Sequence, residues 1–492
     1  MADASGIPRA LSRPAPPWTF WLAVACVGGC FLLAAAAFRL PLSYCDSPSW
    51  APDYLAQLLD IDAQVNVRDR GVFVPAWFRF WGAVSIASGL GNLIGWVQAA
   101  LVGGSALAVL LYLKPGLTWI ELVLLPALVL SGLRHAVYSQ TVMSEPVVIP
   151  LVVGLTLWLM RTGPVSLRAC AVIPALAVVA TSSRPENLVL VALVLARVAA
   201  DAGPLRQRAQ RLALALAVAS GVSVGFARLA PDEPGEPIGR VMVVAEWMRF
   251  LEPPRNALAR LLHSDLAERL SPDAAAGVRT IYDGLPPTQR LFEGPHAPSW
   301  PATARFVLYQ LANRPFTVLV DRMRVGVDLH ASGYAAFWPG YSPASSFYQA
   351  YDQVFVRWTP EDFDAARYSC PIFARAQLRH YGPPVVRSER AVAALHALHA
   401  AGVGYAQWVL RPLYWLAVPV SLLLIAGRRA GAPYVWLVLL LVGNLGLKAA
   451  SVYADERYQL PVDLLALAWL MLTLRHAFAS GSARARPEVR AR

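Results

Sequence analysis

Charge is scarce in this sequence: Asp, Glu, Lys and Arg make up only 15% of its 492 residues, whereas 57% are hydrophobic. Soluble proteins carry about a quarter charged residues, so the composition excludes an ordinary soluble enzyme. The hydrophobic residues are grouped in separate blocks of roughly 20 residues, the length of helix that crosses about 30 Å of hydrocarbon. We therefore predict an all-α polytopic membrane protein.

Cysteine and histidine are also scarce, at five and eight residues. Cys26, Cys30 and Cys170 fall within apolar blocks, where a thiol fills space. Cys45 and Cys370 lie in hydrophilic segments outside the cytoplasm, and two interpretations stay open: a disulfide between them or two unrelated thiols. The histidines are scattered along the chain, so the sequence does not indicate a zinc site.

A glycine-rich loop that opens a helix after a strand is absent, so no nucleotide-binding site is predicted. The net charge of +12 comes from arginines in short hydrophilic links and at both ends of the chain. This distribution is typical of signals that set membrane topology. We therefore expect membrane lipids as partners and no nucleic acid.

Ten transmembrane spans are predicted from the apolar blocks. The first, at 18–38, has a longer apolar core than a cleavable signal peptide, which indicates an uncleaved anchor. An amphipathic and aromatic segment at 72–90 favours a helix that lies flat in the membrane interface. The other nine spans are predicted near 92–113, 117–137, 145–161, 168–182, 187–200, 209–230, 405–426, 433–452 and 459–476.

The arginine and lysine residues of the short loops predict that both termini are cytoplasmic. The loops on the opposite side carry acidic or mixed charge. Residues 231–404 contain no run able to span, and we expect an extracytoplasmic domain of mainly helical or mixed structure, with helical stretches such as 388–401. The remaining regions are an N-terminal transmembrane module at 1–230 with its first outer loop at 41–91, a C-terminal transmembrane module at 405–477, and a basic cytoplasmic tail at 478–492.

Four polar clusters are placed on the outer surface by this topology, each at a membrane boundary. Charged groups at membrane depth usually face a polar cavity or a partner. Structural interpretations are also open: Glu145 starts a helix, Glu186 pairs with Arg184, and 455–457 form a solvated hairpin. The clusters are CDSPSW with Asp46, QTVMSEP with Glu145, SSRPEN with Arg184 and Glu186, and YADERYQLP with Asp455, Glu456 and Arg457, and Lys448 lies near the same side.

In this order the motifs resemble the GT-C superfamily of polytopic glycosyltransferases, of the protein O-mannosyltransferase and aminoarabinose-transferase type. Asp46 matches the acidic motif of the first outer loop, and VFVPAWFRFWG at 72–82 matches the interfacial helix that follows it. MSEPVVIP at 143–150, SSRPENLVL at 182–190 and RYQLPVD at 457–463 are similar to the later elements. Many members carry two adjacent acids in the first loop, whereas Asp46 is followed by Ser47 and the next acid is Asp53.

The resemblance implies transfer of a sugar from a polyprenyl-phosphate donor to an extracytoplasmic acceptor, in the inner membrane of a bacterium. The acceptor would be an envelope lipid, a glycan or a protein. Asp46 is our choice for the general base, with Asp53 second. Whether a divalent cation such as Mg²⁺ or Mn²⁺ takes part stays open. The residues assigned to the donor phosphate are Arg457, Lys448 and Arg184, and those assigned to orienting the acceptor or the cations are Glu145, Glu186 and Tyr458.

Three other functions stay open at this point. A transporter of lipid-linked substrates would also place charged residues along a path, although no inverted repeat is visible in the sequence. A polysaccharide polymerase or ligase would use the same lipid donors. A non-catalytic envelope protein of GT-C type is the third alternative, because the pair of adjacent acids is incomplete.

Overall fold

The computed structural model describes residues 15–38, 72–90, 92–114, 119, 123–184, 187–229, 300–318, 320, 387–451 and 460–484. Within these residues the chain is mostly helical and has no strand, which confirms the helical fold class for the described part. The longer helices are α2 (Pro17–Ala37), α5 (Phe73–Ala87), α6 (Leu93–Leu113), α8 (Leu125–Tyr138), α9 (Glu145–Leu159), α10 (Leu167–Ser183), α11 (Leu188–Ala199), α12 (Leu205–Leu229), α16 (Trp300–Asn313), α21 (Glu389–Tyr405), α22 (Arg411–Ala426), α23 (Ala432–Ser451) and α24 (Leu460–Arg484), and a short π-helical segment, η6, covers Ala406–Leu410.

Five helical stretches of the described residues are long and apolar enough to cross a membrane. Four shorter apolar helices accompany them, at Glu145–Leu159, Leu167–Ser183, Leu188–Ala199 and Ala432–Leu447. This composition is that of a membrane protein, and the count of ten spans stays a prediction. The five candidate spans are Pro17–Ala37, Leu93–Leu113, Leu205–Leu229, Trp408–Ala426 and Pro461–Phe478.

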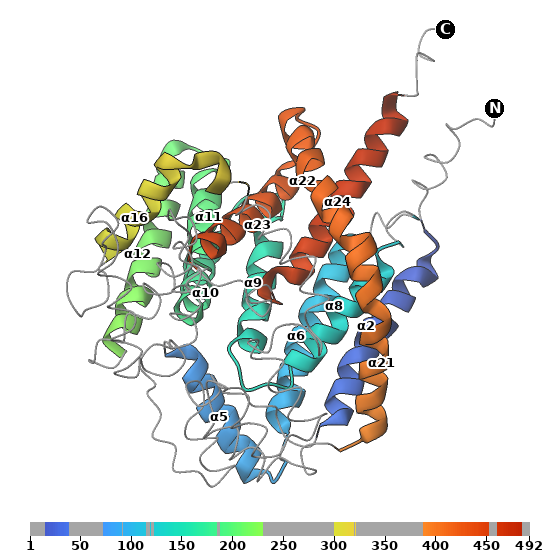
Figure 1. Cartoon of the computed structure of the whole chain (residues 1–492). Helices are drawn as coiled ribbons and strands as arrows, with labels where there is room; N and C mark the ends of the chain where they lie inside the picture. Colours follow the sequence, from blue (N-terminus) through green and yellow to red (C-terminus); the bar gives the residue numbers. More distant parts are fainter. Residues whose placement is uncertain are drawn as a thin grey trace, which may run out of the picture.

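The described helices pack as a bundle around a large apolar core, with a smaller apolar cluster at Val165, Cys170, Val198 and Ala215 (Figure 1). α2 lies beside α6, α8 and α21, and α9 contacts both α6 and α10. α24 comes from the C-terminal part of the chain, yet it contacts α6, α8 and α9 and is largely buried. In contrast, α12 packs only on α10 and α11 among the strongly contacting helices and buries little of its apolar surface.

The helix starts have local causes in the sequence. Pro126, Pro146 and Pro412 each stand in a first turn, where the missing N–H has no intrahelical partner to lose. α10 begins with a side-chain cap, because the Ser166 hydroxyl accepts a hydrogen bond of 3.2 Å from the Ala169 N–H. These signals fix where the helices start, and therefore where the connecting segments gather.

α21, which lies before the last predicted spans, is part of the helix bundle. The N–H of Arg387 donates to the Ala37 carbonyl at the end of α2, and the Tyr405 hydroxyl donates to the Val123 carbonyl just before α8. α21 therefore runs lengthwise beside α2 and α8, and helical structure continues through η6 into α22. The boundary predicted at 404 falls inside this continuous helical stretch, and the predicted span at 405–426 begins where α21 ends.

Small residues explain how α21 fits there. A Cβ added at Gly402 would lie 1.9 Å from Leu130 Cδ2, so any other residue would force the Leu130 side chain or α21 to move. Because α21 packs against protein through such residues, it is rich in alanine and lacks the hydropathy of the predicted spans.

α5 lies at one end of the bundle, on α6 and α10 (Figure 1). It has 15 residues, about 22 Å of helix, which is too short to cross 30 Å of hydrocarbon. Val74 and Phe78 are buried, whereas 61% of Phe80 is exposed. The helix predicted within 72–90 is thus present, and its position in the membrane interface stays a prediction.

Candidate functional site

Buried polar side chains gather at one end of the bundle, where α2, α8 and α10 end and α6, α9 and α24 begin. We call this region the polar end. Hydrogen bonds and ion pairs join the helix ends there, so the residues come from segments that are far apart in the sequence. The polar end is defined by Asn92, Arg134, Gln140, Ser144, Glu145, Arg184 and Asp463, each at most 6% exposed.

Glu145 and Arg184 form a buried ion pair at the polar end. Glu145 is the first residue of α9 and is fully buried, and Arg184 follows the last residue of α10. Arg184 Nη2 contacts Glu145 Oε1, and Arg184 Nε donates to the Ser144 hydroxyl at 2.8 Å. The same hydroxyl donates to Glu145 Oε2 at 3.2 Å. This triangle fixes the plane of the Arg184 guanidinium, because its Nε and its Nη2 are bonded to different partners.

The structural interpretation of the sequence, in which Arg184 pairs with Glu186, stays a prediction, because Glu186 lies outside the described residues. Arg184 does bond a carboxylate from the start of the preceding helix, that of Glu145. Since α9 and α10 are antiparallel neighbours, the start of one and the end of the other lie close together. Two of the motifs behind the family resemblance, MSEP and SSRPEN, therefore meet at one place.

A second buried ion pair links α8 to α24, and the sequence analysis missed it. Arg134 Nη1 lies 2.5 Å from Asp463 Oδ2, and each side chain is only 1% exposed. Asp463 is the last residue of the RYQLPVD motif and stands in the first turn of α24. A signal was present, because Arg134 lies inside a predicted span, where a charged residue needs a partner.

Amide side chains join α2, α6 and the segment after α8. The Asn92 amide donates to the Phe38 carbonyl at 3.3 Å and to Gln140 Oε1 at 2.9 Å. Gln140 Nε2 in turn donates to the Gly95 carbonyl at 3.2 Å. A Cβ at Gly95 would lie 2.4 Å from Asn92 Oδ1, so this network also requires a glycine in the first turn of α6.

The other predicted site residues are not placed by the structure. Lys448 lies in α23, near its last residue, and only its backbone is described. Of the predicted set, Glu145 and Arg184 are therefore the two whose side chains can be compared, and they are in contact. Asp46, Asp53, Glu186, Arg457, Tyr458, Cys45 and Cys370 lie outside the described residues.

A divalent-cation site does not fit the carboxylates that the structure describes. Among the described residues, no group of three or more His, Cys, Asp or Glu side chains could hold a metal ion. Glu145 and Asp463 each face a guanidinium, and its positive charge opposes a bound cation. These two carboxylates are better described as partners of arginine.

No protein-family model, curated protein or solved structure matches this chain. The family resemblance therefore depends on the motifs in the sequence.

Proposed function

We propose that this chain is an integral membrane glycosyltransferase that moves a sugar from a polyprenyl-phosphate donor to an acceptor at the polar end. The observation that carries the proposal is the buried triangle of Ser144, Glu145 and Arg184. It unites two motifs that the resemblance assigns to one site. Burying a charged pair costs several kcal/mol of desolvation per ion, about as much as its attraction returns, so stability alone is weak grounds for it.

Arg184 has the chemistry for the leaving group. When the bond between the anomeric carbon and the phosphate oxygen breaks, the lipid phosphate keeps the electron pair and gains negative charge. A guanidinium held in one plane stabilises that charge without having to reorganise. Glu145 acts as a positioning residue in this proposal, because it holds Arg184. Arg457 and Lys448 are the additional cations that the sequence assigns to the phosphate.

The acceptor hydroxyl oxygen attacks the anomeric carbon and loses its proton to a carboxylate. We assign this general base to Asp46, with Asp53 second, and a base of this kind typically contributes about 10² to 10⁴-fold. Glu186 and Tyr458 are assigned to orienting the acceptor. Every atom is then accounted for: the sugar moves to the acceptor oxygen, the proton to the carboxylate and the charge to the phosphate.

The test compares wild type, a deletion strain and the Asp46→Asn variant, with membrane insertion confirmed for the variant. Asp60→Asn is the matched control, because Asp60 lies in the same predicted loop and has no assigned role. Mass spectrometry of envelope glycolipids and glycans should show the same loss in Asp46→Asn as in the deletion, and no loss in Asp60→Asn. Identical glycans in all four strains would refute the enzyme proposal.

Transport of a lipid-linked substrate is the second candidate, because of the pair between Arg134 and Asp463. Ionisable residues inside a helix bundle often mark a substrate path, and this pair lies between α8 and α24. Vesicles containing the purified protein separate the two functions. A transporter moves a labelled lipid-linked sugar across the bilayer unchanged, whereas a transferase yields a new glycoside on one side.

A further inference from the structure

The helices α9, α10, α11 and α12 have a second end, opposite the polar end, where arginine residues outnumber acidic ones. We call it the arginine end, and it is defined by Arg161, Arg168, Arg197, Arg206, Arg208, Arg211 and Asp201. α9 and α11 end there, and α10 and α12 begin there. Among the described residues from 146 to 229, Asp201 is the one acidic residue, so the six arginines of the arginine end are accompanied by a single described carboxylate.

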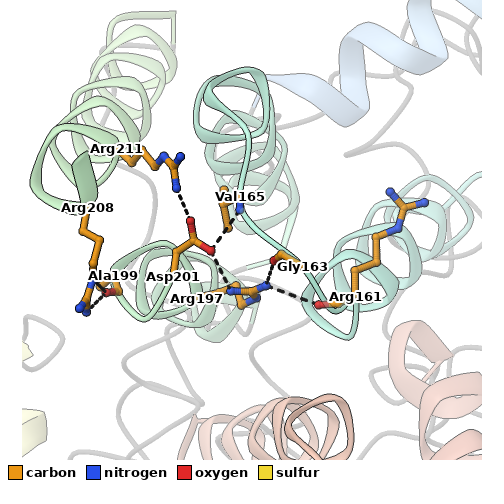
Figure 2. Close-up of polar contacts among 8 residues, drawn as sticks. All are labelled: Arg161, Gly163, Val165, Arg197, Ala199, Asp201, Arg208 and Arg211. Carbon is orange, nitrogen blue, oxygen red and sulfur yellow. Dashed lines mark hydrogen bonds and ion pairs between the residues drawn. The ribbon is translucent and has the colours of Figure 1, made fainter. Parts of the chain in front are cut away.

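That carboxylate is turned inward (Figure 2). Asp201 is 2% exposed, and its Oδ1 accepts a hydrogen bond of 3.1 Å from the Val165 N–H. Arg211 pairs with Oδ2, and Arg197 Nη1 lies 3.7 Å from Oδ1. Asp201 therefore links the start of α10 to α11 and α12, and its negative charge is buried and paired with arginine.

Arginine side chains also bond backbone carbonyls at this end. Arg197 Nη2 donates to the Gly163 carbonyl after α9 at 2.6 Å, and Arg208 Nε donates to the Ala199 carbonyl at the end of α11 at 3.0 Å (Figure 2). The Arg208 contact compensates the C-terminus of α11, which carries partial negative charge, whereas Arg197 bonds a carbonyl of the link between α9 and α10. The N-termini of α10 and α12 lie at the same end and add partial positive charge. Arg197, Arg208 and Arg211 are therefore bonded to acceptors of the protein itself.

Three arginines remain for a ligand. Arg161, Arg168 and Arg206 are exposed, and their guanidinium groups bond no acceptor within the described part of the chain. Figure 2 shows the Arg161 side chain pointing away from Asp201. Arg206 stands in the first turn of α12, and Arg168 stands in the first turn of α10, which packs on α12, whereas Arg161 follows α9. α12 is a helix of membrane-crossing length whose apolar side chains are largely uncovered, with Leu205 80% exposed.

We propose that the arginine end binds the phosphate-bearing headgroup of an anionic phospholipid. Arg161, Arg168 and Arg206 supply the positive charge, since guanidinium groups match phosphate oxygens in shape and charge. The acyl chains lie along the uncovered side of α12, which is why a lipid fits better than a soluble phosphate. This site is independent of the proposed enzyme activity, because it lies at the other end of the helices.

The experiment titrates phosphatidylglycerol into the detergent-solubilised full chain and counts bound lipids by native mass spectrometry. Phosphatidylcholine with the same acyl chains is the lipid control, because its headgroup carries no net charge. Each basic residue near an anionic surface contributes about 1 kcal/mol, so each Arg→Gln change should weaken phosphatidylglycerol binding about fivefold. The triple variant Arg161→Gln, Arg168→Gln, Arg206→Gln should bind it on the order of 100-fold more weakly.

Arg228→Gln is the matched protein control, because Arg228 is an exposed arginine in the last turn of the same α12. It should leave binding unchanged. Equal binding of the two lipids, or retention by the triple variant, would overturn the proposal. Competition by glycerol 1-phosphate at equal concentration would overturn it too, by assigning the site to a soluble phosphate. Should the triple variant fail to fold, the single variants supply the same test, with an expected fivefold weakening of phosphatidylglycerol binding in each.

Discussion

The ion pair between Arg134 and Asp463 should dominate the stability of the contact between α8 and α24. The N–O distance is 2.5 Å, and both side chains are 1% exposed, so neither charge has water as an alternative partner. Asp463→Asn keeps the shape of the side chain but removes its charge. The Arg134 guanidinium then stays buried without this carboxylate, at a depth where an unpaired charge is costly.

The expected loss is large because of this burial. Removing one partner of a buried pair costs about 3–5 kcal/mol. That corresponds to roughly two to four orders of magnitude in the unfolding equilibrium constant. Asp463 also stands in the first turn of α24, where an acid gains about 0.3–1 kcal/mol from the helix dipole. Arg134→Met should cost a similar amount, since it leaves Asp463 buried and charged.

The double variant Arg134→Met, Asp463→Leu distinguishes a charge effect from a packing effect. Replacing a buried pair by apolar residues is often neutral or stabilising, so the double variant should lie within about 1 kcal/mol of wild type. Unfolding by sodium dodecyl sulfate in mixed micelles, followed by tryptophan fluorescence, measures wild type, Asp463→Asn, Arg134→Met, the single variant Asp463→Leu and the double variant. If the losses in Arg134→Met and Asp463→Leu are below about 1 kcal/mol, or if they simply add in the double variant, the reasoning is wrong.

Three further predictions test packing and polar contacts with the same unfolding assay. Gly402→Ala should separate α21 from α8, because the new Cβ would overlap the Leu130 side chain, and it should lower the free energy of unfolding by about 1–3 kcal/mol. Gly104→Ala is the control, because a Cβ there meets nothing within 4 Å, and it should be neutral or slightly stabilising. Asp201→Asn should cost about 1–3 kcal/mol, less than Asp463→Asn, because its arginine partners are partly exposed. Tyr434→Phe should cost about 1–3 kcal/mol, because the buried Tyr434 hydroxyl bonds two other buried hydroxyls at 2.6 and 2.7 Å. A neutral result for any of the destabilising changes would contradict the contact concerned.

The helices predicted best from the sequence are those that are apolar along a length sufficient to cross a membrane. The predicted 92–113 became Leu93–Leu113, and the predicted 18–38 became Pro17–Ala37. α21 was harder to predict as part of the bundle, because Ala and Gly residues let it pack on protein, and mean hydropathy does not respond to close packing. Length and apolarity therefore identify long apolar helices more readily than a helix that packs through small residues.

The candidate site shows a similar division. Antiparallel threading placed Glu145 and Arg184 on one side, and that placement follows from loop lengths and arginine counts alone. It assigned Glu145 and Glu186 alike to orienting the acceptor or the cations and did not single out the contact between Arg184 and Glu145, because such a contact depends on side-chain reach at a helix end. Arg134 lay inside a predicted span and was read as part of the apolar block, although its charge required a partner such as Asp463.

The two ends of the helices use arginine in opposite ways. At the polar end, two arginines and two carboxylates sum to zero charge and are almost fully buried. At the arginine end, six arginines against one buried Asp201 leave a net charge of +5, much of it exposed. In the proposed reaction, a phosphate that reaches Arg184 would share the guanidinium with Glu145, so Glu145 would limit how tightly the lipid phosphate is held after transfer. In the proposed lipid site, a phosphate would meet no carboxylate on Arg161, Arg168 or Arg206, which would suit lasting lipid contact at the arginine end and turnover at the polar end.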